Sequence, residues 1–116
     1  MQIKRKKTGT MKIAIVGSRT INPVITLPFK PSLIVSGGAP GVDTAAKEYA
    51  ASRNIPFQEI KPDYARYNRS APIIRNKEIV DLVDMLFIYW DGSSRGTYMV
   101  LEYAKKKKKT IILKTA

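Results

Sequence analysis

Short apolar segments alternate with polar or helix-forming ones along this chain of 116 residues, and this alternation constrains the fold more than any other feature. The expected strands are MKIAIV (11–16), SLIV (32–35), FQEI (57–60), MLFIYW (85–90) and TIIL (110–113). Nearly continuous apolar runs are typical of strands buried on both faces of a sheet. Because strands that alternate with helices are joined by right-handed crossovers, we expect five parallel strands covered by helices on both faces.

Three of the connecting segments carry helix signals. From residue 42 small apolar side chains recur at helical spacing; Asn54 is expected to end this helix in a left-handed conformation, and Pro56 prevents its continuation. Pro72 suits the first turn of a second helix. The inner positions of that helix would be Ile73, Ile79, Val80 and Val83, and those of a third helix Val100, Leu101 and Ala104. The sequence therefore predicts an α/β fold, a Rossmann-like three-layer sandwich in one domain over residues 11–116, preceded by a basic tail over residues 1–10.

The charge is concentrated in two places. The chain has 21 Lys and Arg against 9 Asp and Glu, but nine of the basic residues lie in two runs, residues 4–7 and 105–109. Such runs are commonly solvated chain or helix ends, and the alternative is a surface for nucleic acid or another anionic partner. No stretch approaches the roughly 18–20 apolar residues that cross a bilayer, so we expect a cytoplasmic protein with no membrane partner.

Histidine and cysteine are both absent. Their absence excludes Ser-His-Asp and Cys-His nucleophile systems, an imidazole base, disulfides and Cys/His zinc sites. Any catalysis would have to use carboxylates, Lys, Tyr, hydroxyls, backbone amides or a borrowed cofactor. We expect neither a bound metal nor a resident cofactor.

Polar segments follow the expected strands, and in open α/β sheets ligands bind beyond the carboxyl ends of the strands. These segments are GSRT (17–20), SGGAPGVD (36–43), PDYARYNR (62–69) and DGSSRGT (91–97). Glycine lets a backbone amide approach a phosphate, and the second and fourth segments lead into helices whose N-termini attract anions. Neither GxxxxGK[ST] nor GxGxxG is present, so an ordinary nucleoside triphosphatase and a standard dinucleotide dehydrogenase are not expected.

Arg19, Arg75 and Arg95 lie in or beside these segments. A guanidinium suits phosphate or carboxylate, and the plain alternative is a surface arginine paired with a nearby aspartate. Arg75 is the most informative of the three. A cation near the start of a helix opposes the helix dipole, so a bound anion or a structural carboxylate is expected beside it.

The ordered motifs GSR, VSGGAPGVD, PDYxxYxRxxxxIRN and WDGSSRGT resemble the YspA-like branch of the SLOG superfamily, over roughly residues 12–113. Members of this superfamily are Rossmann-like proteins predicted to bind nucleotides or nucleotide-derived ligands, ADP-ribose-type signals included. The resemblance implies that the first and fourth strands are neighbours, which brings GSR against DGSSRGT. The ligand-binding residues expected from the motifs and the sheet edge are Gly17, Ser18, Arg19, Ser36, Gly37, Gly38, Gly41, Asp43, Arg75, Asn76, Asp91, Gly92, Ser94, Arg95, Gly96 and Thr97.

The chain is also similar to the Lonely-Guy phosphoribohydrolases, which cleave the N-glycosidic bond of nucleoside monophosphates with an arginine and a glutamate in PGGxGTxxE. Arg75 matches the arginine, but Val100 stands where the glutamate is expected, and Glu102 would lie on the wrong face of its helix. Asp91 and Asp43 are the remaining carboxylates for such chemistry. N-glycosidic hydrolysis is therefore an alternative to binding alone, and whether the protein is an enzyme stays open.

A third similarity is to the DNA-processing protein A family, whose SLOG domain carries related motifs and binds single-stranded DNA. The basic runs fit this interpretation. Tyr64 and Tyr67, interleaved with Arg66 and Arg69, would stack bases, or else the tyrosines pack the long loop against the fold. Binding of single-stranded nucleic acid is thus a second alternative.

The sequence departs from the family pattern in two places. Residues 20–32 contain three prolines and have room for at most a turn or two of helix, so the first crossover is shortened and one face of the sheet is expected to be poorly covered. A homo-oligomer, dimeric or larger, would cover that face. Asn68 stands where relatives often have glycine, and asparagine is tolerated there in a left-handed conformation.

Asp43 lies in the first turn of its expected helix. Its carboxylate either complements the helix dipole or binds a ligand hydroxyl.

Overall fold

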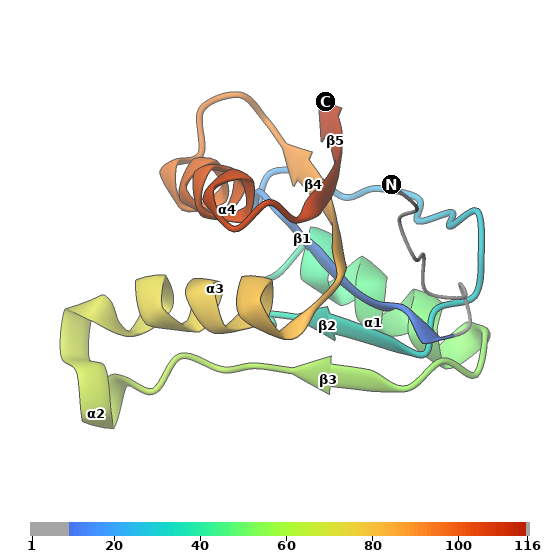
Figure 1. Ribbon diagram of the computed structural model, residues 1–116, viewed down its shortest axis with the longest axis horizontal. Helices are drawn as coiled ribbons and strands as arrows, with labels where there is room; N and C mark the ends of the chain where they lie inside the picture. Colours follow the sequence, from blue (N-terminus) through green and yellow to red (C-terminus); the bar gives the residue numbers. More distant parts are fainter. Residues whose placement is uncertain (1–9, 116) are drawn as a thin grey trace, which may run out of the picture.

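A computed structural model describes residues 10–115 and contains one sheet of five parallel strands in the order β3-β2-β1-β4-β5 (Figure 1). The strands are β1 (Lys12–Gly17), β2 (Leu33–Ser36), β3 (Phe57–Glu59), β4 (Met85–Trp90) and β5 (Thr110–Thr115). The predicted α/β class is confirmed, and β1 pairs with β4 as the family resemblance implies. From β1 the strand order runs to β2 and β3 on one side, and from β4 it runs to β5 on the other. The carboxyl ends of β1 and β4 therefore form the switch point at which such folds bind ligands. The predicted basic tail lies outside the described residues except for Thr10.

Helices cover both faces of the sheet. They are α1 (Val42–Ser52), α2 (Tyr64–Tyr67), the 3-10 turn η2 (Asn68–Ser70), α3 (Ala71–Leu82) and α4 (Arg95–Lys106). Ile13 and Ile15 of β1 pack into a core with α1, whereas Ala14 and Val16 pack into a second core with α3 and α4. This alternation along one strand produces the predicted three layers. None of the helices in residues 10–115 is long and apolar enough to cross a membrane.

The connection between β1 and β2 contains no helix, as its prolines predict. Instead, an extended segment covers part of the α1 face by burying Ile25, and the amide of Leu27 donates a hydrogen bond to the Tyr49 hydroxyl at 3.3 Å. The edge strand β5 receives less cover. Ile112 and Leu113 remain 37% and 43% exposed, so apolar surface is left at this edge of the sheet.

Two local expectations need correction. Ile73 was expected to face inward but is 40% exposed, because α3 buries Ala71 and a residue two positions later lies on the opposite side of a helix. The loop after β3 contains the short helix α2, which buries none of its residues and so has no apolar periodicity to reveal it. Asn54 has a φ of 56°, in agreement with the predicted left-handed position. Asn68 also has a positive φ, 52°, but its ψ of −127° lies outside the left-handed helical region.

Candidate functional site

A cavity of about 400 Å³ opens at the carboxyl ends of β1 and β4, beside the first turns of α3 and α4. Most of the residues expected at a ligand site line it: Gly17, Arg19, Gly37, Asp43, Arg75, Asn76, Asp91, Ser94, Gly96 and Thr97. Three apolar side chains, Val16, Ile79 and Val100, form its inner wall. The cavity therefore combines a polar rim, which carries two arginines, with an apolar inner wall, as ligand sites commonly do.

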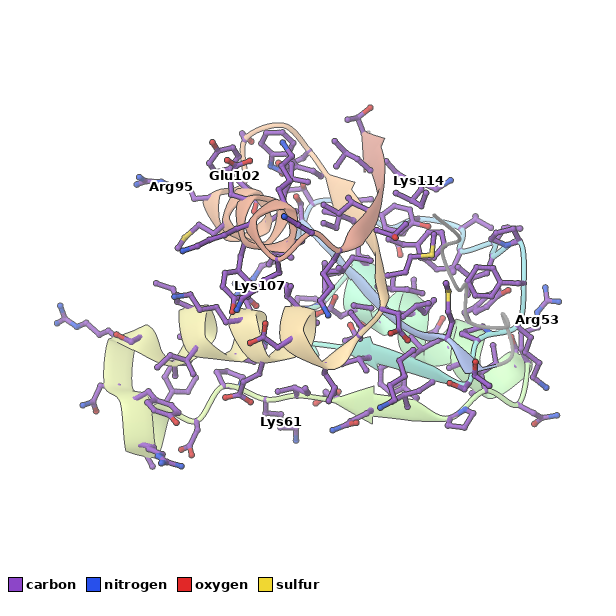
Figure 2. All side chains as sticks on the ribbon, viewed as in Figure 1. Arg53, Lys61, Arg95, Glu102, Lys107 and Lys114 are labelled. Carbon is purple, nitrogen blue, oxygen red and sulfur yellow. The ribbon has the colours of Figure 1, made fainter. Side chains whose placement is uncertain are left out.

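The other expected residues do not line the cavity. Ser36 is fully buried, Gly38 and Gly41 shape the turn from β2 to α1, and Gly92 has a φ of 88° in the turn before α4. Arg95 is exposed at the start of α4, and Figure 2 shows its side chain directed away from the molecule.

Ser18 joins the two segments that the family resemblance expects to meet. Its buried hydroxyl accepts a hydrogen bond from the amide of Asp91 at 3.1 Å and lies 3.4 Å from the Thr97 hydroxyl. These contacts connect the end of β1 to the turn after β4 and to the first turn of α4. Ser18 thus holds two walls of the cavity together.

The carboxylate of Asp91 organises the turn that leads into α4. Its Oδ1 accepts hydrogen bonds from the amides of Ser93 and Ser94 at 2.9 and 2.8 Å, and its Oδ2 accepts one from the Thr20 hydroxyl at 2.7 Å. These hydrogen bonds hold the pKa of Asp91 well below its ordinary value. A carboxylate that stays ionised and is already hydrogen-bonded through both oxygens is poorly suited to act as a general acid.

Gly96 leaves open space at the N-terminus of α4. It lies in the first helical turn, and a Cβ placed on it would meet no atom within 4 Å. Gly96 has neither a positive φ nor a close neighbour that would require glycine. Glycine also weakens a helix, so the fold alone does not explain its presence here. Ser94 caps the helix by accepting a hydrogen bond from the amide of Thr97 at 3.5 Å, whereas the amide of Gly96 has no acceptor within residues 10–115. A free amide with no Cβ in front of it is an arrangement that accommodates an anion.

Arg75 lies on α3 at the cavity rim and has no carboxylate at ion-pair distance in the described part of the chain. Its Nη1 donates to the carbonyl of Gly37 at 2.7 Å, and its Nε donates to the Asn76 side-chain oxygen at 2.8 Å. A Cβ on Gly37 would approach Nη1 to 2.9 Å, so glycine at this position admits the guanidinium. Because both acceptors are neutral, the positive charge of Arg75 is oriented but not compensated by a salt bridge.

Asp43 is the buried carboxylate of the cavity, with 6% of its surface exposed. Its Oδ2 accepts a hydrogen bond from the amide of Ala39 at 2.8 Å, while its Oδ1 and the nearby hydroxyl of Ser36 have no hydrogen-bond partner among the described residues. Burial raises the pKa of Asp43 above its ordinary value, and the Ala39 amide, the Ser36 hydroxyl, the Arg75 guanidinium and the Gly37 amide oppose that rise. Asp43 therefore differs from Asp91 in being a buried carboxylate whose Oδ1 accepts no well-formed hydrogen bond from the described residues.

Glu102 does not take the place of the glutamate that the Lonely-Guy resemblance expects at Val100. Val100 is 4% exposed and belongs to the apolar wall, whereas Glu102 is exposed and pairs with Lys105 at 3.3 Å. Within residues 10–115 no group of three or more acidic side chains could hold a metal ion.

Several cavity residues were not named as ligand-binding from the sequence. Thr20, Ala39 and Pro72 lie on the rim, and the apolar wall comes from Val16, Ile79 and Val100. The signal was available for Thr20 and Ala39, which belong to the segments GSRT and SGGAPGVD, and for Pro72 at the start of the helix that carries Arg75.

The fold and the cavity define a Rossmann-like α/β protein with a site at its switch point. Searches against family models, curated proteins and solved structures find no match to this chain. The resemblance to the YspA-like SLOG family therefore rests on the sequence motifs.

Proposed function

We propose that this protein binds a nucleotide or a nucleotide-derived ligand, with a phosphate at the first turn of α4 and the guanidinium of Arg75. The observation that carries the proposal is that Arg75, which forms no salt bridge within residues 10–115, and the open amide of Gly96 lie on the rim of one cavity. Charge-assisted hydrogen bonds from guanidinium and amide groups are the usual means by which proteins hold phosphate. Arg19, on the same rim, adds a further positive charge.

The rest of the cavity suits the sugar and base of such a ligand. The Oδ1 of Asp43 is buried and accepts no hydrogen bond from the described residues, so a rotation of this carboxylate would bring it to a ribose hydroxyl in the cavity. The wall of Val16, Ile79 and Val100 offers apolar contact to a base. We assign the hydroxyl contact to Asp43 rather than Asp91, whose oxygens already accept hydrogen bonds.

Calorimetry and thermal shift with the ribonucleoside 5′-monophosphates test this proposal. At least one nucleotide should raise the melting temperature, and Arg75→Gln should weaken its binding by roughly tenfold or more, the usual effect of losing a charged hydrogen bond. Arg53→Gln is the matched control, because Arg53 is an exposed arginine at the opposite end of the molecule (Figure 2). The proposal fails if no nucleotide binds, or if the Arg75 and Arg53 variants bind equally well.

One observation favours hydrolysis as a second candidate function. Asp43 is a buried carboxyl group with a raised pKa beside the cavity, which is the environment in which enzymes place acid–base carboxyls. Release of free base from a bound nucleoside monophosphate, lost in Asp43→Asn while binding persists, would establish this activity. Binding without base release would leave the protein a binder.

Two lysines of residues 105–109 contact the fold. Lys105 pairs with Glu102 at 3.3 Å on the surface, and Lys109 donates a hydrogen bond to the carbonyl of Val83 at 2.8 Å. The run begins at the last turn of α4, whereas the cavity is at its first. The exposed lysines 105–108 therefore do not form a nucleic-acid surface continuous with the cavity, and a structural contact is assigned to Lys109.

A further inference from the structure

A short exposed arm precedes α3, the helix that forms one side of the cavity. Residues 62–70, called here the α2 arm, contain α2 and η2, and Figure 1 shows them beyond the end of the sheet toward which β3 points, beside the first turn of α3. The arm ends at Ser70, two residues before Pro72, which lines the cavity rim. The arm itself does not line the cavity, and it joins the fold at the end of α3 that carries Pro72.

The arm has a defined shape although no residue of α2 or η2 is buried. Asp63 caps α2 by accepting a hydrogen bond from the amide of Arg66 at 3.1 Å, and the Arg66 guanidinium lies 5.2 Å from the centre of the Tyr67 ring. Asn68, with its positive φ, turns the chain back toward α3. Local contacts thus hold in place a segment that adds no buried apolar side chain to the core.

The charges on the arm have no counterpart in the fold. Arg66 and Arg69 are exposed, and neither is at ion-pair distance from a carboxylate in residues 10–115. The acidic side chains nearest in sequence are engaged elsewhere: Asp63 in the cap of α2, and Glu59 with Lys61 at 3.8 Å. An anionic group from outside the fold is the partner that such arginines can still accept.

The arm also presents an aromatic face. Tyr64 is 58% exposed, whereas Tyr67 is half-buried and already faces Arg66. An exposed ring next to free arginines is the combination on which nucleic-acid bases and phosphates bind, with stacking on the ring and charge on the guanidinium. Tyr64 is thus the ring of the arm with a face available to a base.

The cavity itself has room for a small ligand. Its volume of about 400 Å³ is near the low end of the range of roughly 300–1,000 Å³ found for ligand pockets. A ligand larger than one nucleotide would therefore extend past the rim, and beyond Pro72 at the start of α3 the adjoining segment of the chain is the α2 arm.

We propose that the ligand carries two nucleotide units joined through phosphate, one in the cavity and the second on the α2 arm. The base of the second unit stacks on Tyr64, and the linking or terminal phosphate contacts Arg66 and Arg69. This inference rests on the proposed function and names its ligand class. A phosphodiester and a pyrophosphate linkage present the same chemistry to the arm, so the experiment includes both.

The test compares one nucleotide unit with two. Dissociation constants are measured by calorimetry for the four ribonucleoside 5′-monophosphates, for the four 5′-phosphorylated homodinucleotides, and for diadenosine 5′,5′-diphosphate. A linked pair should bind at least about tenfold more tightly than its monophosphate, the gain expected from one stacked base with its phosphate contact. The double variant Arg66→Gln/Arg69→Gln and the single variant Tyr64→Ala should each reduce this gain, and Arg53→Gln should retain it.

The possible results are distinguishable. Monophosphates that bind as tightly as the linked pairs overturn the inference and leave the proposed function intact. A gain that survives both arm variants also overturns it, because the second unit then lies elsewhere. If neither monophosphates nor linked pairs bind, the proposed function fails, and the inference fails with it. Melting temperatures equal to that of the wild type show that the arm variants remain folded.

Discussion

Replacing Gly96 with alanine separates the stability of α4 from the binding of a phosphate at its N-terminus. A Cβ on Gly96 would meet no atom within 4 Å, so alanine fits the folded protein without a clash. Alanine is more stable than glycine in a helix by roughly 0.5–1 kcal/mol. For a domain of this size that gain raises the melting temperature by about 2–5 °C. In the absence of ligand, differential scanning fluorimetry should therefore show a more stable variant.

The same methyl group stands where a phosphate would approach the Gly96 amide. The loss of that charge-assisted hydrogen bond should weaken nucleotide binding by roughly tenfold or more, measured by calorimetry. Arg53→Gln, at an exposed arginine that does not line the cavity, is the control and should keep both the melting temperature and the affinity of the wild type. A Gly96→Ala protein that is more stable yet binds like the wild type would refute the placement of a phosphate at α4.

Three further predictions concern stability and assembly. Asp91→Asn should lower the melting temperature at neutral pH. Because the pKa of Asp91 is lowered in the folded protein, the difference in melting temperature from the wild type should be full above the ordinary pKa of 3.8 and should shrink as the pH falls below it. Lys109→Ala removes the hydrogen bond to the carbonyl of Val83 and should cost about 0.5–1.5 kcal/mol in urea unfolding, whereas Lys106→Ala, at an exposed side chain, should change stability by less than about 0.5 kcal/mol. The expected homo-oligomer was assigned to the face beside the first crossover, but Ile25 is buried there and the exposed Ile112 and Leu113 make β5 the better surface. Light scattering at micromolar concentration should give a mass above the monomer for the wild type and a monomer for Ile112→Lys, and a monomeric wild type would contradict this.

The fold was predictable because its signals are local. The run MLFIYW coincides with β4, and its side chains alternate between the two cores in register with β1. The positive φ of Asn54 follows from its place between a helix and a proline. By contrast, β5 extends to Thr115, two residues past the predicted end. Lys114 and Thr115 still pair with β4 through the backbone, and because they lie at the edge of the sheet their side chains are polar and gave no strand signal.

The details of the site depend on contacts between distant segments, which sequence patterns do not specify. The motifs placed Arg75 and Asp91 at the correct edge of the sheet, but only the folded geometry distinguishes them. Asp91 is held by the Thr20 hydroxyl, which is 71 residues away in the chain, whereas Arg75 contacts Gly37 without forming an ion pair. Ile73 was misplaced for a similar reason, since the inward side of α3 is set by where its first turn meets the sheet.

The central claim is that a ligand phosphate binds at the cavity rim between α3 and α4. Titration of ¹⁵N-labelled protein with the tightest-binding nucleoside monophosphate tests it most directly, because each amide reports its own surroundings. The account predicts that the largest shifts occur at the backbone amides of Gly37, Gly96 and Thr97 and at the Arg75 side chain. Shifts confined to residues 105–109 and their neighbours would contradict it.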